Sequence, residues 1–431
     1  MQLDQSGPKQ QSADDAKLLH DIDIMFADVR SDKIAVAVSG GGDSMALLHL
    51  FIRWSAQTGV SVVAVTLDHG LRPEAAGEAE FVGRFCAAHG VSHTILNWVG
   101  SHAVGNVQAA AREARYAMIA AWALEHGAGA VALGHTADDI AETFLMRLAR
   151  KSGVDGLAAM PHRFERCGVR WGRPLWQRRR TALRDYLRRH DLDWIDDPSN
   201  EDLTQTRPQA RTILGALAPL GIDVDVLQST ASALASARSA LQAWAIEEAL
   251  RVVTLENGDV LIATHSGPPV HPEIARRLQL AALYFINGAA YAPRESALIH
   301  LEAALINQSR HTVAGCIVTK VEGGLRYCRE FNAVEGPVVW PDRAVAIVWD
   351  GRWTLRKNDG SDHAGNLTVR ALGDALSDVA DWQKSGLPRA SLLASPAVFD
   401  RDTLVAAPVA GLQNGFSARI VADFASFLVC R

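Results

Sequence analysis

One short segment restricts the fold of this chain more than any other: an apolar run at residues 34–38 that leads directly into a glycine-rich turn. The run contains only Ile, Ala and Val, which is typical of a parallel strand buried on both faces. Beyond the turn, apolar side chains recur with helical spacing, at Leu47, Leu50, Phe51 and Trp54. The sequence therefore predicts a strand, a glycine turn and an amphipathic helix in direct succession.

The composition of the turn indicates an anion-binding loop. Glycine permits positive φ and lets the backbone approach an oxyanion, and a helix start offers unpaired N–H groups and the positive end of its dipole. We expect phosphate groups to be bound by Ser39, Gly40, Gly41, Gly42, Asp43 and Ser44. A glycine turn with helix-capping serines and no ligand stays open as the alternative.

Asp43 is the unusual member of this turn, because an acid beside phosphates requires a cation. A bridging Mg²⁺ supplies one, so Asp43 is the candidate metal ligand. The chain contains no Gly-Lys-Ser/Thr sequence, which excludes a Walker loop, and the turn lacks the spacing of a dinucleotide site.

Short β-rich runs alternate with amphipathic helices between residues 17 and 217, which predicts one α/β domain around a parallel sheet. Further strands are expected at Val60–Leu67, Thr94–Val99 and Ala130–Leu133. A long helix is expected over residues 106–126, with Asn106 as its N-cap and Gly127 ending it. Residues 1–16 are polar and are expected to be disordered.

At 431 residues the chain is longer than one core usually supports, so further domains are expected. Residues 222–310 are rich in Ala and Leu with helical periodicity, which predicts a helical domain. Residues 311–431 contain short Val/Ile/Thr runs broken by Gly, Pro, Asp and Asn, which predicts a small α+β or β-rich domain. Whether residues 222–431 form one domain or two is left open.

Charge and cysteine content narrow the class of protein. The net charge is −5, yet residues 147–180 carry a local charge of +8, which is typical of a phosphate-binding surface or of an ordinary solvated face. The five cysteines form no C-x-x-C pair, which argues against a zinc or iron–sulfur site. No signal peptide and no apolar run long enough for a membrane span is found, so a cytoplasmic protein is expected.

The glycine turn resembles the pyrophosphate-binding loop of the N-type ATP pyrophosphatases, and five further elements resemble the tRNA(Ile)-lysidine synthetase family in their order along the chain. They are residues Asp68–Arg72, Ala111–Tyr116, Gly134–Thr143, the pair of segments Gly153–Met160 and Arg173–Leu175, and Asp196–Asn200. The resemblance implies a Rossmann-like N-type ATP-pyrophosphatase domain. It also implies that ATP adenylates the C2 oxygen of the wobble cytidine in an isoleucine tRNA with a CAU anticodon. The ε-amine of free L-lysine then displaces AMP from C2 and forms lysidine.

The resemblance also implies residue roles. It makes residues 39–44 the ATP-binding loop and assigns catalysis to Asp43, Arg112, His135 and Arg207. Arg207 is less secure, because Pro208 stands where the family has Asn and favours a helix start at 208. The roles of Arg115, Arg211, His69 and Arg72 are left open.

A helix is expected over residues 137–149, capped by Thr136 with Asp139 three positions on. Asp139 and Glu142 share one face of this helix, where two carboxylates can hold the ammonium group of lysine. Stabilisation of the positive helix start is the alternative role for these acids, and for Asp138.

The resemblance implies that the basic stretch binds tRNA. Contacts from Arg and Lys to phosphates position a tRNA without reading its sequence. Arg173, Arg178 and Arg179 are the expected tRNA contacts. Oligomeric state is left open, with a homodimer as one expectation. A tRNA thiolase of the same superfamily and a non-catalytic tRNA-binding protein are the competing functions. The missing cysteine pair counts against the first, and the intact loop with Asp139 and Glu142 counts against the second.

Overall fold

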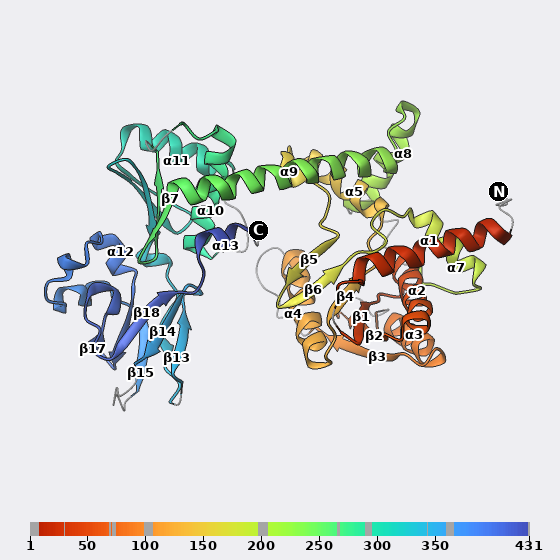
Figure 1. Ribbon diagram of the computed structural model, residues 1–431, viewed down its shortest axis with the longest axis horizontal. Helices are drawn as coiled ribbons and strands as arrows, with labels where there is room; N and C mark the ends of the chain where they lie inside the picture. Colours follow the sequence, from red (N-terminus) through yellow and green to blue (C-terminus); the bar gives the residue numbers. More distant parts are fainter. Residues whose placement is uncertain are drawn as a thin grey trace. The chain divides into compact units, whose positions relative to one another are not determined.

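The computed structural model of this chain describes residues 8–29, 31–68, 70, 75–98, 107–196, 206–264, 268–288, 295–342, 344–358 and 366–429. The chain divides into two compact units, Met1–Arg238 and Ser239–Arg431, shown in Figure 1. His69 and Arg72, Asn106 and Cys430 lie outside the described residues, as do residues 197–200 of the last family element.

The first unit is built on a six-stranded sheet in the order β3-β2-β1-β4-β6-β5. Its strands are parallel except at one edge, where β5 runs antiparallel to β6. All four predicted strands are confirmed, with ends shifted by at most two residues. The strands are β1 (Lys33–Ala37), β2 (Ser61–Asp68), β3 (Ser92–Asn97), β4 (Ala130–Leu133), β5 (Arg163–Arg166) and β6 (Val169–Gly172).

Both faces of this sheet are buried, because side chains of each strand alternate between two cores. Ile34 and Val36 point into a core with α1, α2, α3 and α7, whereas Ala35 faces the core that α4 covers. The helices of the unit are α1 (Pro8–Phe26), α2 (Gly42–Thr58), α3 (Ala75–Ala88), α4 (Val107–Glu125), α5 (Ala137–Leu148), α6 (Val154–Leu157), α7 (Arg180–Arg189) and α8 (Thr206–Leu217).

The order of the strands determines where a ligand can bind. From β1 the chain first builds outward through β2 to β3, and then crosses to the other side of β1 to form β4. The connections after β1 and β4 therefore leave the sheet in opposite directions and open a crevice at the carboxyl ends of these strands. The glycine turn follows β1 and residues 134–136 follow β4, so both predicted elements meet at this crevice.

The expectation of a disordered N-terminus is wrong for residues 8–16, which lie in α1. This helix packs on α2 (Figure 1). The Phe26 ring of α1 and the Phe51 ring of α2 meet there edge to face, with centroids 5.4 Å apart. Asp15, only 7% exposed, accepts hydrogen bonds from Arg53 on α2 and Arg189 on α7, each 2.8 Å long. The polar composition of the segment misled the prediction, because these partners lie 38 and 174 residues away.

The predicted helix at 106–126 is confirmed by α4, which ends at Glu125 and is followed by Gly127 with a φ of +67°. The helix α9 (Val224–Val252) runs from the first unit into the second. Its early residues Val224, Leu227 and Ala231 pack against α5. These contacts hold α5 against the start of α9.

The second unit contains three antiparallel sheets, ordered β7-β8-β11-β10-β9, β12-β15-β16-β17 and β13-β14-β18. The first lies against α10 and α11, and the other two enclose a core that contains Trp340, Trp349 and Trp353. The strands are β7 (Val253–Glu256), β8 (Asp259–Ala263), β9 (Arg310–Val313), β10 (Cys316–Val321), β11 (Gly324–Arg329), β12 (Val338–Val339), β13 (Ala346–Trp349), β14 (Trp353–Lys357), β15 (Leu367–Ala371), β16 (Pro396–Asp400), β17 (Thr403–Ala406) and β18 (Phe416–Ile420). The helices are α10 (Pro272–Asn287), α11 (Glu295–Asn307), α12 (Arg389–Leu393) and α13 (Phe424–Val429).

The expected domain boundary at residue 310 falls inside the first of these sheets, because β8 pairs with β11 across it. Residues 222–310 are also not purely helical, since they contain β7 and β8. The helical periodicity was visible in the sequence, whereas the long-range strand pairing was not. No helix among the described residues has the length and apolar character needed to cross a bilayer.

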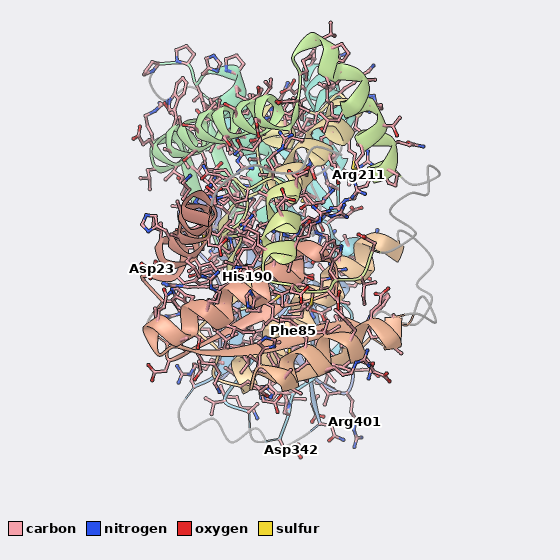
Figure 2. All side chains as sticks on the ribbon, turned by 90° about the vertical axis from the view of Figure 1, so that its right-hand side faces the viewer. Asp23, Phe85, His190, Arg211, Asp342 and Arg401 are labelled. Atoms are coloured by element: carbon pink, nitrogen blue, oxygen red, sulfur yellow. The ribbon has the colours of Figure 1, made fainter. Side chains whose placement is uncertain are left out.

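A polar cluster between α1, α2 and α7 makes stability depend on pH. His49 on α2 is hydrogen-bonded through Nδ1 to the Tyr186 hydroxyl at 2.7 Å, and Arg53 and His190 lie close by (His190 is labelled in Figure 2). Burial, together with His190, Arg53 and His89, lowers the pKa of His49 from 6.5 to about 4, against the opposing effect of Asp15. The folded protein therefore holds His49 neutral where the unfolded chain protonates it.

We predict that the free energy of unfolding falls as the pH drops from 6.5 towards 4, because the unfolded state then binds more protons than the folded state. The slope of this free energy against pH reports how many more protons the unfolded state binds than the folded state. His49→Gln should reduce that number by up to about one. Urea unfolding at several pH values measures this change in the free energy of unfolding. His20→Gln, at an exposed position of α1, is the control, and an unchanged slope in His49→Gln would contradict the assignment.

Candidate functional site

The glycine turn has the backbone of an anion-binding loop. Gly40 has a φ of +84°, and α2 begins at Gly42 with Gly41 as its N-cap. Ser44 tightens the turn, because its hydroxyl donates to the Gly41 carbonyl at 2.8 Å and accepts from the Ser39 N–H at 3.2 Å. The first N–H groups of α2 have no partner within the helix and are directed at the crevice.

Gly134 allows the second loop to approach the first. A Cβ atom at this position would lie 3.2 Å from the Asp43 carbonyl carbon and oxygen and from the Ser44 Cα atom. A larger residue would need the end of β4 or the start of α2 to shift by a few tenths of an ångström. The glycine of the predicted Gly134–Thr143 element therefore permits this close approach, which places His135 and α5 beside the glycine turn.

A third segment closes the crevice from the side of α7. The Ile195 N–H donates to the Gly40 carbonyl at 3.0 Å, and Trp194 contacts Gly42. The cavity at this crevice has a volume of about 880 Å³. Its polar lining includes Ser39, Asp43, Ser44, Glu78, Arg115, His135, Asp139, Arg180, Arg184, Asp196, Arg207 and Arg211.

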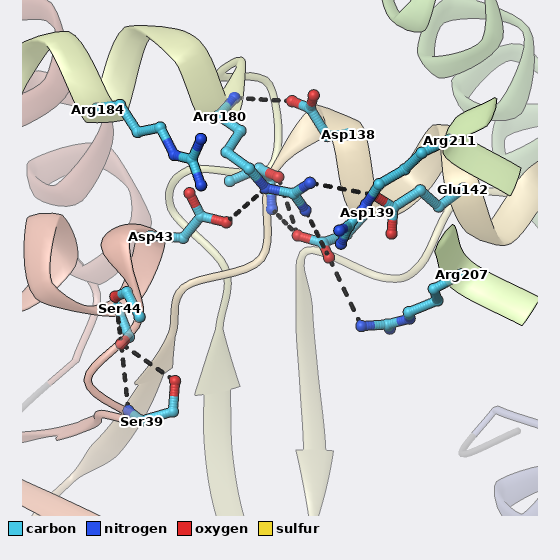
Figure 3. Close-up of polar contacts among 12 residues, drawn as sticks. Ser39, Asp43, Ser44, Asp138, Asp139, Glu142, Arg180, Arg184, Arg207 and Arg211 are labelled. Carbon is cyan, nitrogen blue, oxygen red and sulfur yellow. Dashed lines mark hydrogen bonds and ion pairs between the residues drawn. The ribbon is translucent and has the colours of Figure 1, made fainter. Parts of the chain in front are cut away.

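Three carboxylates at this cavity share one guanidinium group (Figure 3). Arg180, at the start of α7, lies 3.1 Å from Asp43, 3.1 Å from Glu142 and 3.5 Å from Asp139. Glu142 is 1% exposed and its Oε1 atom also accepts from Arg211 at 2.6 Å. The site is thus a buried cluster of alternating charges rather than an open acidic pocket.

The predicted cap of α5 is confirmed. Asp139 Oδ2 accepts from the Thr136 N–H at 2.8 Å and from its hydroxyl at 2.9 Å. Its other oxygen faces Arg180, so Asp139 serves the helix start and the site together. Asp138 accepts from the Arg180 N–H at 2.7 Å, which makes it a cap for α7.

Burial and charge set the protonation states of the cluster. Burial raises the pKa of Asp43 to about 6, with Arg180 opposing the shift and Asp139 adding to it. Burial alone would raise the pKa of Asp139 as well, but Arg180 and the hydrogen bond from the Thr136 N–H hold it below the usual value. Asp43 is therefore the carboxyl group of this pair that takes up a proton more readily.

His135 is held in one tautomer. The Arg173 Nε–H donates to its Nδ1 atom at 3.1 Å, so the ring proton of the neutral imidazole resides on Nε2. Burial and the nearby Arg173 lower the pKa of His135 well below its usual value, so the ring stays neutral at pH 7. His135 offers the cavity an N–H donor without a charge.

The other predicted site residues differ in whether they line the cavity. Arg207 is 47% exposed and lies 3.9 Å from Asp139, and both it and Arg115 line the cavity. Arg112 is exposed, with its guanidinium 5.9 Å from the centre of the Tyr116 ring, and the described cavity wall does not include it. Pro208 lies in the first turn of α8, which begins at Thr206 rather than at 208.

Two of the arginines expected to contact tRNA already bind other residues of this chain. Arg173 is 3% exposed and is bonded to His135 and Tyr116, so its guanidinium is not available to a phosphate. Arg178 forms a two-pronged pair with Asp21 at 2.6 and 2.9 Å. Arg179 is 36% exposed and lies 3.0 Å from Asp225. Sequence composition could not show that most of these cations neutralise carboxylates of the chain itself.

Sequence reasoning missed Arg180 as a site residue. It is the last of three consecutive arginines, and nothing local shows which of the three turns inward. The one available signal was the surplus of acids in the predicted site, because buried carboxylates need counter-ions.

Comparisons with known proteins agree with this geometry. The family model of the PP-loop domain matches residues 15–217. A tRNA(Ile)-lysidine synthase of Ruegeria pomeroyi is 44% identical over 90% of this chain and 91% of its own length. Proteins of the same name from Wolbachia pipientis and Mesorhizobium japonicum are each 34% identical, over 77% and 91% of this chain and 78% and 88% of their own lengths. This chain belongs to the tRNA(Ile)-lysidine synthase family.

Proposed function

We propose that this chain is a ligase that converts the wobble cytidine of an isoleucine tRNA with a CAU anticodon into lysidine, using ATP and free lysine. The observation that carries the proposal is that a phosphate-binding loop and the face of α5 with Asp139 meet at one cavity. ATP and an amine can therefore be held close to the same inserted base.

The reaction has two steps. The C2 oxygen of cytidine attacks the α-phosphorus of ATP, and the bond from that phosphorus to the pyrophosphate oxygen breaks. The lysine ε-nitrogen then attacks C2, the C2–O bond breaks, and AMP leaves as the amine loses a proton. AMP makes the C2 oxygen a good leaving group, which is why two phosphates of ATP must be expelled first.

The predicted site residues have distinct parts in these steps. The N–H groups at the start of α2 bind the departing pyrophosphate. The neutral His135 donates from Nε2 to a phosphate or base oxygen, while Arg207 and Arg115 neutralise charge that develops on the phosphates. Arg112 stays a proposed catalytic residue at the exposed side of α4. Asp139 and Glu142 bind the ammonium group.

A magnesium ion fits this site. Among the described residues Asp43 Oδ1 is buried without a hydrogen-bond partner, and one carboxylate plus phosphate oxygens is a common way to hold Mg²⁺. The ion would supply positive charge to the leaving pyrophosphate.

The described cysteines do not support sulfur transfer. Burial raises the pKa of the Cys86 and Cys328 thiols to about 11 and that of Cys316 to about 12, so these groups stay protonated and unreactive. Cys167 is exposed, but one thiol provides no pair.

We predict that lysine and the CAU-anticodon isoleucine tRNA together trigger the release of AMP and pyrophosphate from ATP. Mass spectrometry of nucleosides from the treated tRNA should detect lysidine. If radiolabelled lysine never becomes linked to that tRNA, the proposed reaction is wrong. Methionine tRNA with the same anticodon is the control substrate.

We predict that Asp43→Asn lowers adenylation of the tRNA at least about 100-fold, because it removes the carboxylate that would hold the magnesium ion. tRNA affinity, measured by filter binding, should stay within about two-fold of wild type. Asp185→Asn, at the exposed ion pair of α7 with Arg188, is the matched control. Equal loss of tRNA binding in Asp43→Asn would assign Asp43 to folding or docking instead.

We propose that exposed cations of the basic stretch bind the tRNA. They include Arg179, and also Arg150 and Lys151, which are both exposed in the loop after α5. The double change Arg150→Gln and Lys151→Gln should lower the slope of log affinity against log salt by about two. Arg178→Gln should leave the slope unchanged, because Asp21 already neutralises that side chain. The opposite pattern would place the interface on the Arg178 side.

A further inference from the structure

The proposed amine site is already filled by the chain's own cations. Three carboxylates, Asp43, Asp139 and Glu142, face three guanidinium groups, Arg180, Arg207 and Arg211, at 2.6 to 3.9 Å. The formal charge of this group is balanced before any substrate enters. An added ammonium would leave an unpaired positive charge in a partly buried site, which is costly.

Access is restricted as well as charge. Asp139 and Arg180 line the cavity, whereas Glu142 is 1% exposed and lies behind Arg180 and Arg211. Yet Glu142 Oε2 is buried without a hydrogen-bond partner among the described residues, so this carboxylate has an unused acceptor. A ligand N–H can reach it only after one of the two guanidinium groups has moved.

Arg180 is the group whose movement the geometry favours. It contacts Asp43 in the phosphate loop as well as Glu142 and Asp139 on α5, so its guanidinium bridges the two halves of the cavity (Figure 3). Its side chain is 19% exposed and faces the space where the polyphosphate is expected. ATP brings several negative charges there, and a guanidinium binds phosphate oxygens with two N–H groups at once.

We propose that Arg180 is a displaceable counter-ion that occupies the amine site in the free protein. When ATP binds, Arg180 turns to its phosphates and opens Asp139 and Glu142 to the substrate ammonium. This inference rests on the proposed function. It makes nucleotide and amine binding cooperative, and by linkage each ligand raises the affinity for the other by the same factor. The protein therefore assembles the amine site mainly when ATP is present to activate the base.

The test is equilibrium dialysis of radiolabelled L-lysine with the full chain and MgCl₂, with and without α,β-methylene-ATP, which cannot be cleaved to AMP. The wild-type protein should bind lysine about 10-fold more tightly with the analogue. Arg180→Gln should bind lysine at least about 5-fold more tightly than wild type without nucleotide, and gain less than about two-fold from the analogue. Arg188→Gln, on the exposed side of α7, is the control and should behave as wild type.

The outcomes separate the inference from the function it rests on. Equal lysine affinity of the wild-type protein with and without the analogue overturns the inference. This wild-type comparison tests the inference even if Arg180→Gln does not fold. Full nucleotide dependence in a folded Arg180→Gln variant, checked by its melting temperature, also overturns it. Glu142→Gln should weaken lysine binding in both conditions. If the wild-type protein binds no lysine in either condition, the proposed amine substrate itself is wrong.

Discussion

The close contact between the end of β4 and the start of α2 is the constraint on which the site depends. The switch in strand order at β1 opens a crevice, and Gly134 lets the two loops that line it approach each other closely. That contact places the first turn of α5 beside the first turn of α2. The start of α2, with its unpaired N–H groups, and the capped start of α5 then meet at one cavity, and the positive end of α2 suits an anionic substrate.

Buried charge is the second consequence of this arrangement. Asp43 and Asp139 stand at helix starts, where negative charge is favourable, but burial still penalises them. Arg180 offsets this penalty for both acids and for Glu142, and in return they hold its pKa above the ordinary value against the effect of burial. A charge cluster of this kind stabilises the fold weakly, because desolvation cancels much of the attraction. Its benefit is that an incoming charged ligand can exchange places with a resident one.

The elements around the site act as supports at different distances. Arg173 orients His135 and is itself bonded to Tyr116 on α4. Asp138 joins the starts of α5 and α7, which keeps Arg180 next to the acids that it neutralises. Further away, α1 ties α2 to α7 through Asp15, so a segment without site residues holds two helices that carry them.

The sequence by itself determined the local parts of this protein: four strands of the sheet, the phosphate loop, the cap of α5 and the family. These features depend on neighbouring residues, namely the apolar run at 34–38, the glycines beside it and the spacing of Thr136 and Asp139. Only the tertiary structure decided that α1 is ordered, that β8 pairs with β11, and that Arg173 and Arg178 serve the fold while Arg180 enters the site. The physical reason is that a charged side chain has no fixed role along the chain. The role of such a side chain depends on the residue with which it pairs, and the partners of these arginines lie from 38 to 174 residues away in the sequence.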